Sequence, residues 1–126
     1  MCPGKYAKQQ KGRVKMKKIE SIIRPDKLIE IQDKLNGVTT GITVTHVKGY
    51  GATKGETQIY RGTPVTFNLL PKIKIEMVID DDKVEKVIEI IQSVCRTGKI
   101  GDGKIFIYPV EEIIRIRTGE RGEKAL

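Results

Sequence analysis

The clearest pattern in the chain is the strict alternation of apolar and polar side chains over residues 72–79, KIKIEMVI. A period of two predicts a β-strand with one buried face. Two other runs indicate strands as well. In KKIESIIRP (17–25) a β-branched stretch ends at a proline, and in GITVTHVKG (41–49) Ile42 and Val44 alternate with threonines. We therefore expect three strands before residue 80.

Two further segments show the spacing of amphipathic helices. In residues 25–37 the apolar stripe ends at Asn36-Gly37 and consists of Leu28, Ile31 and Leu35, with Ile29 beside them. In residues 80–98 the stripe consists of Val84, Val87, Ile88, Ile91, Val94 and Cys95. Each segment predicts one short helix with a single buried face.

The C-terminal part predicts two more strands, KIFIYPV (104–110) and IIRIRT (113–118). The order is then strand, helix, strand, strand, helix, strand, followed by a short extra strand. A doubled βαβ arrangement of this kind predicts a ferredoxin-like α+β fold. We assign this fold to one domain spanning residues 16–126.

Residues 50–71 do not fit a minimal domain of this type, because they have no sustained period. A structureless segment of this length is either functional or a sign of a wrong assignment. An extension of the flanking strands into a hairpin is the alternative. We favour a long mobile loop, because its glycines, among them Gly51, Gly55 and Gly62, make it costly to order without a partner.

Charge is unevenly distributed along the 126 residues, whose net charge is +8. Residues 1–15 carry five basic and no acidic residues, which leaves +3 for residues 16–126. We interpret 1–15 as a disordered basic extension. The chain has no apolar signal core and no apolar run of ~20 residues, so we expect a cytoplasmic protein. Cys2 and Cys95 are too few for a disulfide framework.

Residues 98–104, GKIGDGK, fit the G-x-x-x-x-G-K frame of a phosphate-binding loop. A true P-loop follows a strand, opens a helix and has Ser or Thr after its lysine. Here a predicted helix precedes the motif, a strand follows it, and Ile105 takes the hydroxyl position. A triphosphatase is therefore not expected. The glycines could still form an anion-binding nest completed by Lys104, or serve only to connect helix and strand.

A second basic feature favours the phosphate alternative. Arg115 and Arg117 lie two apart on a predicted strand, so their guanidinium groups would share one face. Guanidinium groups suit bidentate phosphate binding, and two side by side repel unless an anion or carboxylates neutralise them. On its own the pair would be read as exposed on a solvated strand, but together with the glycine motif it favours a polyphosphate site. Catalytic equipment is sparse, since His46 is the only histidine and no metal-ligand spacing is present. We expect polyphosphate binding without enzymatic turnover.

Several motifs resemble one family closely. Six stretches, in this order from residue 16 to the C-terminus, are similar to the PII signal-transduction proteins of nitrogen regulation: MKKIESIIRPDKL, TVTHVKGYG, ETQIYRG, LLPKIKIEMVI, RTGKIGDGKIFIYPV and IRIRTGE. The resemblance implies a homotrimer with ATP or ADP bound in clefts between neighbouring subunits, and sensing of 2-oxoglutarate. It also implies control of a partner through the long loop. The partner would be an ammonium transporter, a nitrogen-assimilation enzyme or a transcription regulator, and the membrane would be reached only through it.

The resemblance also assigns residues. Gly101, Asp102, Gly103 and Lys104 would hold the phosphates, and Arg115 and Arg117 would reach them from the adjoining subunit. Thr43, Gly51, Ala52 and Val78 match positions around the adenine and the base of the loop. Lys72 matches a lysine that meets either 2-oxoglutarate or nucleotide phosphate.

Two departures from the family pattern change the expected function. In GATKG (51–55), Ala52 replaces an arginine, and Thr53 replaces the glutamine that ligates Mg²⁺ and contacts 2-oxoglutarate. Threonine cannot span the same distance, so we expect weakened or absent Mg²⁺-dependent 2-oxoglutarate binding. Val65 stands where many members carry a uridylylated tyrosine, and Pro64 precedes it. No modification is therefore expected at that position.

Two other classes of function compete with this interpretation. A ferredoxin-like nucleic-acid-binding protein could use the basic residues 1–15, but the chain has only two Phe and four Tyr, and these form no aromatic-rich motif. We therefore expect no nucleic-acid partner. A phosphohydrolase is the third possibility, and failure to release phosphate from ATP would exclude it.

Overall fold

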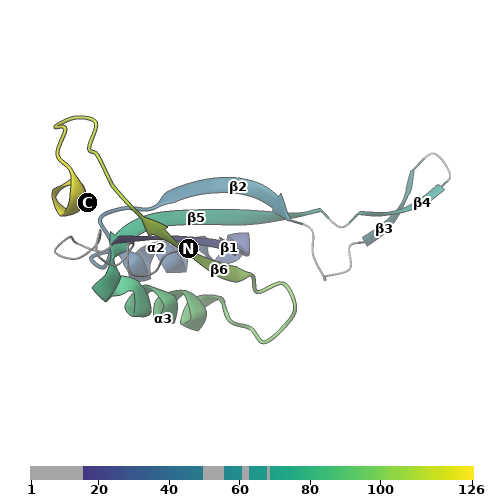
Figure 1. Cartoon of the computed structure of the whole chain (residues 1–126). Coiled ribbons are helices and arrows are strands. Elements are labelled where there is room, and N and C mark those ends of the chain that lie inside the picture. Colours follow the sequence, from purple (N-terminus) through teal and green to yellow (C-terminus); the bar gives the residue numbers. More distant parts are fainter. Residues whose placement is uncertain (1–15, 50–55, 61–62, 68) are drawn as a thin grey trace, which may run out of the picture.

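The computed structural model describes residues 16–49, 56–60, 63–67 and 69–126. Four strands form one antiparallel sheet in the order β2-β5-β1-β6: β1 (Met16–Ile23), β2 (Thr43–Gly49), β5 (Leu70–Asp80) and β6 (Lys104–Val110). The helices α2 (Leu28–Leu35) and α3 (Val84–Cys95) each follow a short 3-10 turn, η1 (Pro25–Lys27) and η2 (Asp81–Lys83). Both helices cover the same face of the sheet (Figure 1). The predicted ferredoxin-like α+β fold is confirmed.

The core lies between that face and the two helices. β5 alternates as predicted, with Ile73, Ile75, Met77 and Ile79 buried. They pack with buried residues of β1, α2 and α3: Ile19, Ile23, Ile31, Leu35, Val87, Ile91, Val94 and Cys95. Both predicted helices are present, but the placement of Ile29 beside the buried stripe is wrong, because its side chain is 80% exposed. At 100° per residue it points away from the stripe formed by Ile31 and Leu35.

Part of the segment expected to lack structure forms a hairpin. β3 (Glu56–Tyr60) pairs with β4 (Thr63–Phe67) in a separate two-stranded antiparallel sheet. This sheet projects beyond the ends of β2 and β5 (Figure 1). A ribbon outside the core does not need an alternating apolar face, which explains why periodicity did not reveal it. The mobility of residues 50–71 stays a prediction, and residues 1–15 and Gly51 to Thr53 lie outside the described residues.

The strand predicted over residues 113–118 is wrong. Only Ile114 forms a bridge, to Arg121, and the chain reverses between them. The Arg115 amide donates to the Glu120 carbonyl and the Gly119 amide to the Arg115 carbonyl, at 2.9 and 2.7 Å. The alternation in IIRIRT matched a strand, but Gly119 adopts a φ of +74° and supports a tight turn instead. The turn leads into η3 (Gly122–Ala125).

No helix in the described part of the chain is long and apolar enough to cross a bilayer.

Candidate functional site

The connection between α3 and β6, residues 96–103, carries the glycine motif. It leaves a helix and enters a strand, the reverse of a P-loop, as the sequence predicts. Ile105, on β6, packs against the core. The position after the lysine therefore has no side-chain hydroxyl, which in a P-loop would bind magnesium. We call residues 97–104 the glycine turn.

Gly103 has to be a glycine for two reasons. Its φ is +96°, which L-residues rarely adopt, and a Cβ at this position would lie 1.9 Å from the carbonyl oxygen of Ile22. Gly101 has a φ of +102°. The backbone here passes against β1 in a conformation in which successive amides can turn toward an anion.

Asp102 stabilises the glycine turn from within. Its carboxylate accepts hydrogen bonds from the Thr97 amide at 2.8 Å, from the Gly98 amide at 3.0 Å and from the Thr97 hydroxyl. It also forms an ion pair with Arg24. The Thr97 hydroxyl and the Arg24 guanidinium hold the pKa of Asp102 well below its usual range. The carboxylate is thus occupied by the protein, and what this residue offers a phosphate is its backbone amide.

Arg24 is a site residue that sequence reasoning missed. It directly follows β1, and its guanidinium group donates to Asp102 and to the carbonyl of Ile100, the latter at 3.0 Å. In the sequence it ends an ordinary strand before a proline. The sequence shows only a charged side chain at the C-terminal end of this strand. Its partners Asp102 and Ile100 lie 78 and 76 residues away, so sequence spacing could not reveal the contact.

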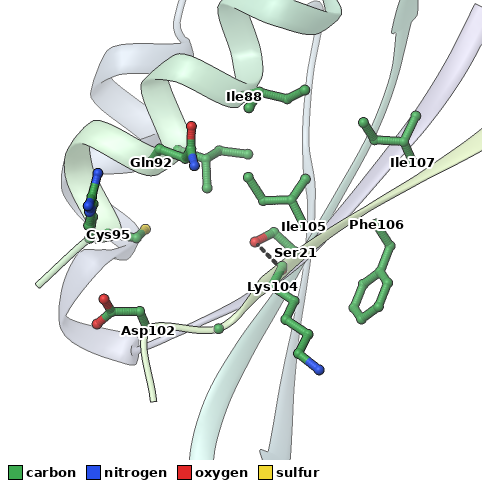
Figure 2. Close-up of a pocket in the computed structure, with 12 residues that line it drawn as sticks. Ser21, Ile88, Gln92, Cys95, Asp102, Lys104, Ile105, Phe106 and Ile107 are labelled. Atoms are coloured by element: carbon green, nitrogen blue, oxygen red, sulfur yellow. Dashed lines mark hydrogen bonds between the residues drawn. The ribbon is translucent and has the colours of Figure 1, made fainter. Parts of the chain in front are cut away.

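Two of the predicted lysines lie at the glycine turn. The Lys72 ammonium donates to the Gly101 carbonyl at 3.2 Å. Lys104 begins β6, where its carbonyl accepts a hydrogen bond from the buried Ser21 hydroxyl at 2.9 Å. The Lys104 side chain lies on the side of β6 opposite Ile105 and α3 (Figure 2). We call the glycine turn, which ends at Lys104, together with Lys72 the turn cluster.

A second set of predicted residues gathers elsewhere. Thr43 and Val78 line a hollow of about 350 Å³ together with Ile113 and Leu126. Arg115 joins this set, because its guanidinium donates to the carbonyl of Leu126 at 2.9 Å and lies 3.8 Å from Glu120. Arg117 is exposed in the turn that follows. We call Thr43, Val78, Arg115 and Arg117 the arginine cluster.

The two clusters lie at opposite ends of the sheet. Lys72 and Val78 are both on β5, and the six residue-to-residue steps between them span about 20 Å of extended strand. Figure 1 shows the turn after α3 at one end of the sheet and the C-terminal segment at the other. Within one chain, therefore, the described residues do not bring Arg115 or Arg117 to the glycine turn. Gly51, Ala52 and Thr53 are not among those residues.

A network of charged side chains lies between the clusters, on the face of the sheet away from the helices. The Lys74 ammonium lies 3.2 Å from Glu76 and 3.5 Å from Glu20, and Lys18 lies 3.4 Å from Glu76. Pairing with Glu76 raises the pKa of Lys74, and Lys74 lowers the pKa of Glu76. The Tyr108 hydroxyl donates to Glu20 at 2.8 Å, which raises the pKa of Tyr108. This face is charge-balanced and not uniformly basic.

A hollow of about 620 Å³ lies on the other side of β6, against α3. Its lining is largely apolar, with Ile88, Ile91, Ile105 and Ile107, and includes the buried thiol of Cys95 (Figure 2). Burial raises the pKa of this thiol. Gly103 and Lys104 also line this hollow, but the Lys104 side chain extends away from Ile105 and α3 (Figure 2), so we do not assign phosphate binding to the hollow.

The described parts of the chain contain no cluster of candidate metal ligands. No three His, Cys, Asp or Glu side chains there are grouped so that they could hold a metal ion. His46 lies exposed on β2. At the glycine turn the groups that could meet a ligand include backbone amides and the ammonium groups of Lys72 and Lys104.

The sequence is similar to that of known proteins over most of its length. The profile of the family described as "Nitrogen regulatory protein P-II" matches residues 16–120. Proteins of that name from Rhodospirillum rubrum and Azospirillum brasilense are 56% and 55% identical over 112 residues, which cover 88% of this chain and 100% of each relative. The protein of that name from Nostoc punctiforme is 52% identical over the same share.

Solved structures give the same result. B. subtilis GlnK matches with a TM-score of 0.73 and 37% identity, covering 89% of this chain and 99% of that one. The B. subtilis GlnK–ATP complex matches with a TM-score of 0.71 and 33% identity, covering 89% and 98%. The fold, the glycine turn and these similarities together show that the chain belongs to the nitrogen regulatory protein P-II family.

Proposed function

We propose that this chain is a non-enzymatic regulator that binds ATP or ADP between the subunits of a homotrimer. The observation that carries the proposal is the separation of its cationic residues into the turn cluster and the arginine cluster, about 20 Å apart on one sheet. The turn cluster supplies amides and lysines, but the guanidinium group beside it, that of Arg24, is bound to Asp102 and the Ile100 carbonyl, and the arginine cluster supplies guanidinium groups without lysines. A site that uses both is completed when the turn cluster of one subunit meets the arginine cluster of its neighbour.

The two clusters would meet at the phosphates of a nucleotide, and residues beside them would border the adenine. The amides of residues 101–103, with Lys72 and Lys104, would hold the phosphates. Arg115 and Arg117 of the neighbouring subunit would add bidentate contacts to the same phosphates. Thr43 and Val78 would border the adenine, and Gly51 and Ala52 the base of the loop. The ATP complex of the similar B. subtilis GlnK supports the choice of ligand.

Control of a partner would follow from a population shift. Nucleotide acts only through different affinities for two arrangements of residues 50–71, which would dock on the partner. We propose an ammonium transporter, a nitrogen-assimilation enzyme or a transcription regulator as that partner, and the cytoplasm as the location. Val65 lacks the hydroxyl that uridylylation requires, so nucleotide occupancy would be the main input.

Nucleic-acid binding is less well supported. Phe106 and Tyr108 are exposed on β6, where a stacking surface would need them. The Tyr108 hydroxyl, however, donates to Glu20, and Glu76 lies nearby in the same charged network. Because lysines on the same face balance these carboxylates, the surface lacks the basic excess that binding a phosphate backbone needs.

Nucleotide binding can be tested by thermal unfolding with ATP or ADP. A ligand at 100 times its Kd stabilises the folded state by about 2.7 kcal/mol, which shifts Tm by several degrees. We expect this shift for the wild type and its loss in Arg115→Ala/Arg117→Ala. Arg121→Ala is the matched control, because Arg121 is an exposed arginine of the same segment, paired with Glu112 at 3.8 Å. A wild-type protein that responds to neither nucleotide contradicts the proposal.

The response to 2-oxoglutarate is a separate prediction. With ATP and Mg²⁺ present, calorimetry should detect weak or no 2-oxoglutarate binding, because Thr53 is too short to replace the glutamine. Thr53→Gln should strengthen binding by at least about tenfold, the effect of one charge-assisted contact. Thr57→Gln, a change of the same type elsewhere in residues 50–71, should have no effect. Micromolar affinity of the wild type would contradict the prediction.

A further inference from the structure

Two side chains from distant parts of the chain lock the glycine turn. Arg24 and Asp102 are 78 residues apart in sequence, and their side chains are only 26% and 22% exposed. The guanidinium group of Arg24 contacts two points of the turn, the Asp102 carboxylate and the Ile100 carbonyl. Asp102 in turn accepts from both the Thr97 and the Gly98 amide. One ion pair thus holds both ends of the turn.

These contacts direct the backbone. In a trans peptide the carbonyl and the following amide point in opposite directions. Because Arg24 binds the Ile100 carbonyl, the amide of Gly101 points away from Arg24. Asp102 occupies the amides of Thr97 and Gly98, at the start of the turn, and so leaves the later amides of residues 101–103, before β6 begins, for a ligand.

A carboxylate beside a phosphate site needs an explanation, because like charges repel. The ion pair with Arg24 and the donors from Thr97 explain how Asp102 stays ionised there. They also imply that its contribution is geometric. If charge alone mattered, the turn would bind a polyphosphate better without Asp102.

We propose that Arg24 and Asp102 are positioning residues that hold the glycine turn in its phosphate-binding conformation, without either side chain needing to contact the nucleotide. This inference rests on the proposed nucleotide-binding function. Electrostatics and positioning predict opposite results for Asp102. Removing its negative charge strengthens ATP binding if charge dominates and weakens it if the turn must be held.

The experiment measures ATP affinity by calorimetry in Asp102→Asn, Arg24→Gln and the double variant. We expect Asp102→Asn and Arg24→Gln each to weaken binding by about tenfold, as the loss of a charge-assisted hydrogen bond does. The double variant should be no weaker than the worse single variant, because both changes break the same contact. Arg24→Lys, which can keep the ion pair, should bind within about threefold of the wild type.

Lys86→Gln is the matched control, because Lys86 is an exposed cation on α3, outside the glycine turn. Its affinity should stay within about twofold of the wild type, the range of a distant screened charge. An Asp102→Asn variant that binds ATP as tightly as the wild type, or more tightly, overturns the inference. The inference is also overturned if the losses of ATP affinity in the two single variants add up in the double variant.

Hydrogen exchange of the ligand-free protein separates this inference from the proposed function. The amides of Thr97 and Gly98 should exchange faster in Asp102→Asn and Arg24→Gln than in the wild type, while amides of the central strand β1 should be unchanged. If the wild type binds no ATP but exchange accelerates, the proposed function fails and the role of the ion pair stands. Unchanged exchange overturns the role of the ion pair even if ATP binds.

Discussion

Gly103→Ala is expected to reduce the free energy of unfolding by about 3 kcal/mol or more and to abolish nucleotide binding. A positive φ alone costs an L-residue about 1–2 kcal/mol. Here the new Cβ would also lie 1.9 Å from the Ile22 carbonyl oxygen. Ile22 cannot move away cheaply, because β1 lies between β5 and β6 in the sheet. The clash between the new Cβ and the Ile22 carbonyl could then be relieved only if the glycine turn itself moved, and the proposed phosphate site would move with it.

Gly98→Ala separates the two contributions. Gly98 lies in the same turn with a φ of +82°, but a Cβ there meets nothing within 4 Å. Its substitution should cost only the backbone strain, about 1–2 kcal/mol in urea denaturation. Equal losses for the two variants would show that the close approach to Ile22 does not contribute. Retained ATP binding in a folded Gly103→Ala protein would show that the turn does not hold the ligand.

Periodicity predicted most of the fold because most of the secondary structure has one buried face. The alternation of Ile73, Ile75 and Met77 and the stripe of α3 both report the core directly. The same reasoning failed where no core face exists. The β3–β4 ribbon has no apolar period, and residues 113–118 have the period of a strand but turn back at Gly119.

The candidate site was predictable to the extent that it is local in sequence. The spacing of Gly101, Gly103 and Lys104 is enough to predict the glycine turn. Arg24 could not be found in this way, because its role depends on the ion pair with Asp102, which only the folded sheet creates. The family resemblance implied that Arg115 and Arg117 act from the adjoining subunit, but no pattern in the residues themselves reveals the distance between the two clusters. Lys72 and Val78 are close in sequence, but an extended strand carries them to opposite ends.

That division leads to the strongest test of the proposed assembly, which mixes two inactive chains. One chain carries Lys72→Ala/Lys104→Ala and so lacks the turn cluster, and the other carries Arg115→Ala/Arg117→Ala and so lacks the arginine cluster. Each should fail to bind ATP alone. In a ring of head-to-tail contacts assembled from an equal mixture, about a quarter of the interfaces join an intact turn cluster to an intact arginine cluster. Calorimetry of the mixture should therefore recover ATP binding at about a quarter of the sites with near wild-type affinity.

The control mixes two chains that are both damaged in the turn cluster, Lys72→Ala and Lys104→Ala. These residues lie in the same half, since the Lys72 ammonium contacts the glycine turn that Lys104 ends. No arrangement of these two chains can produce an intact turn cluster, so mixing should give no binding beyond that of the separate proteins. If each site were complete within one chain, the first mixture would also recover nothing. Recovery in the first mixture alone therefore requires a site shared between subunits, because only an interface can combine residues that every single chain holds about 20 Å apart.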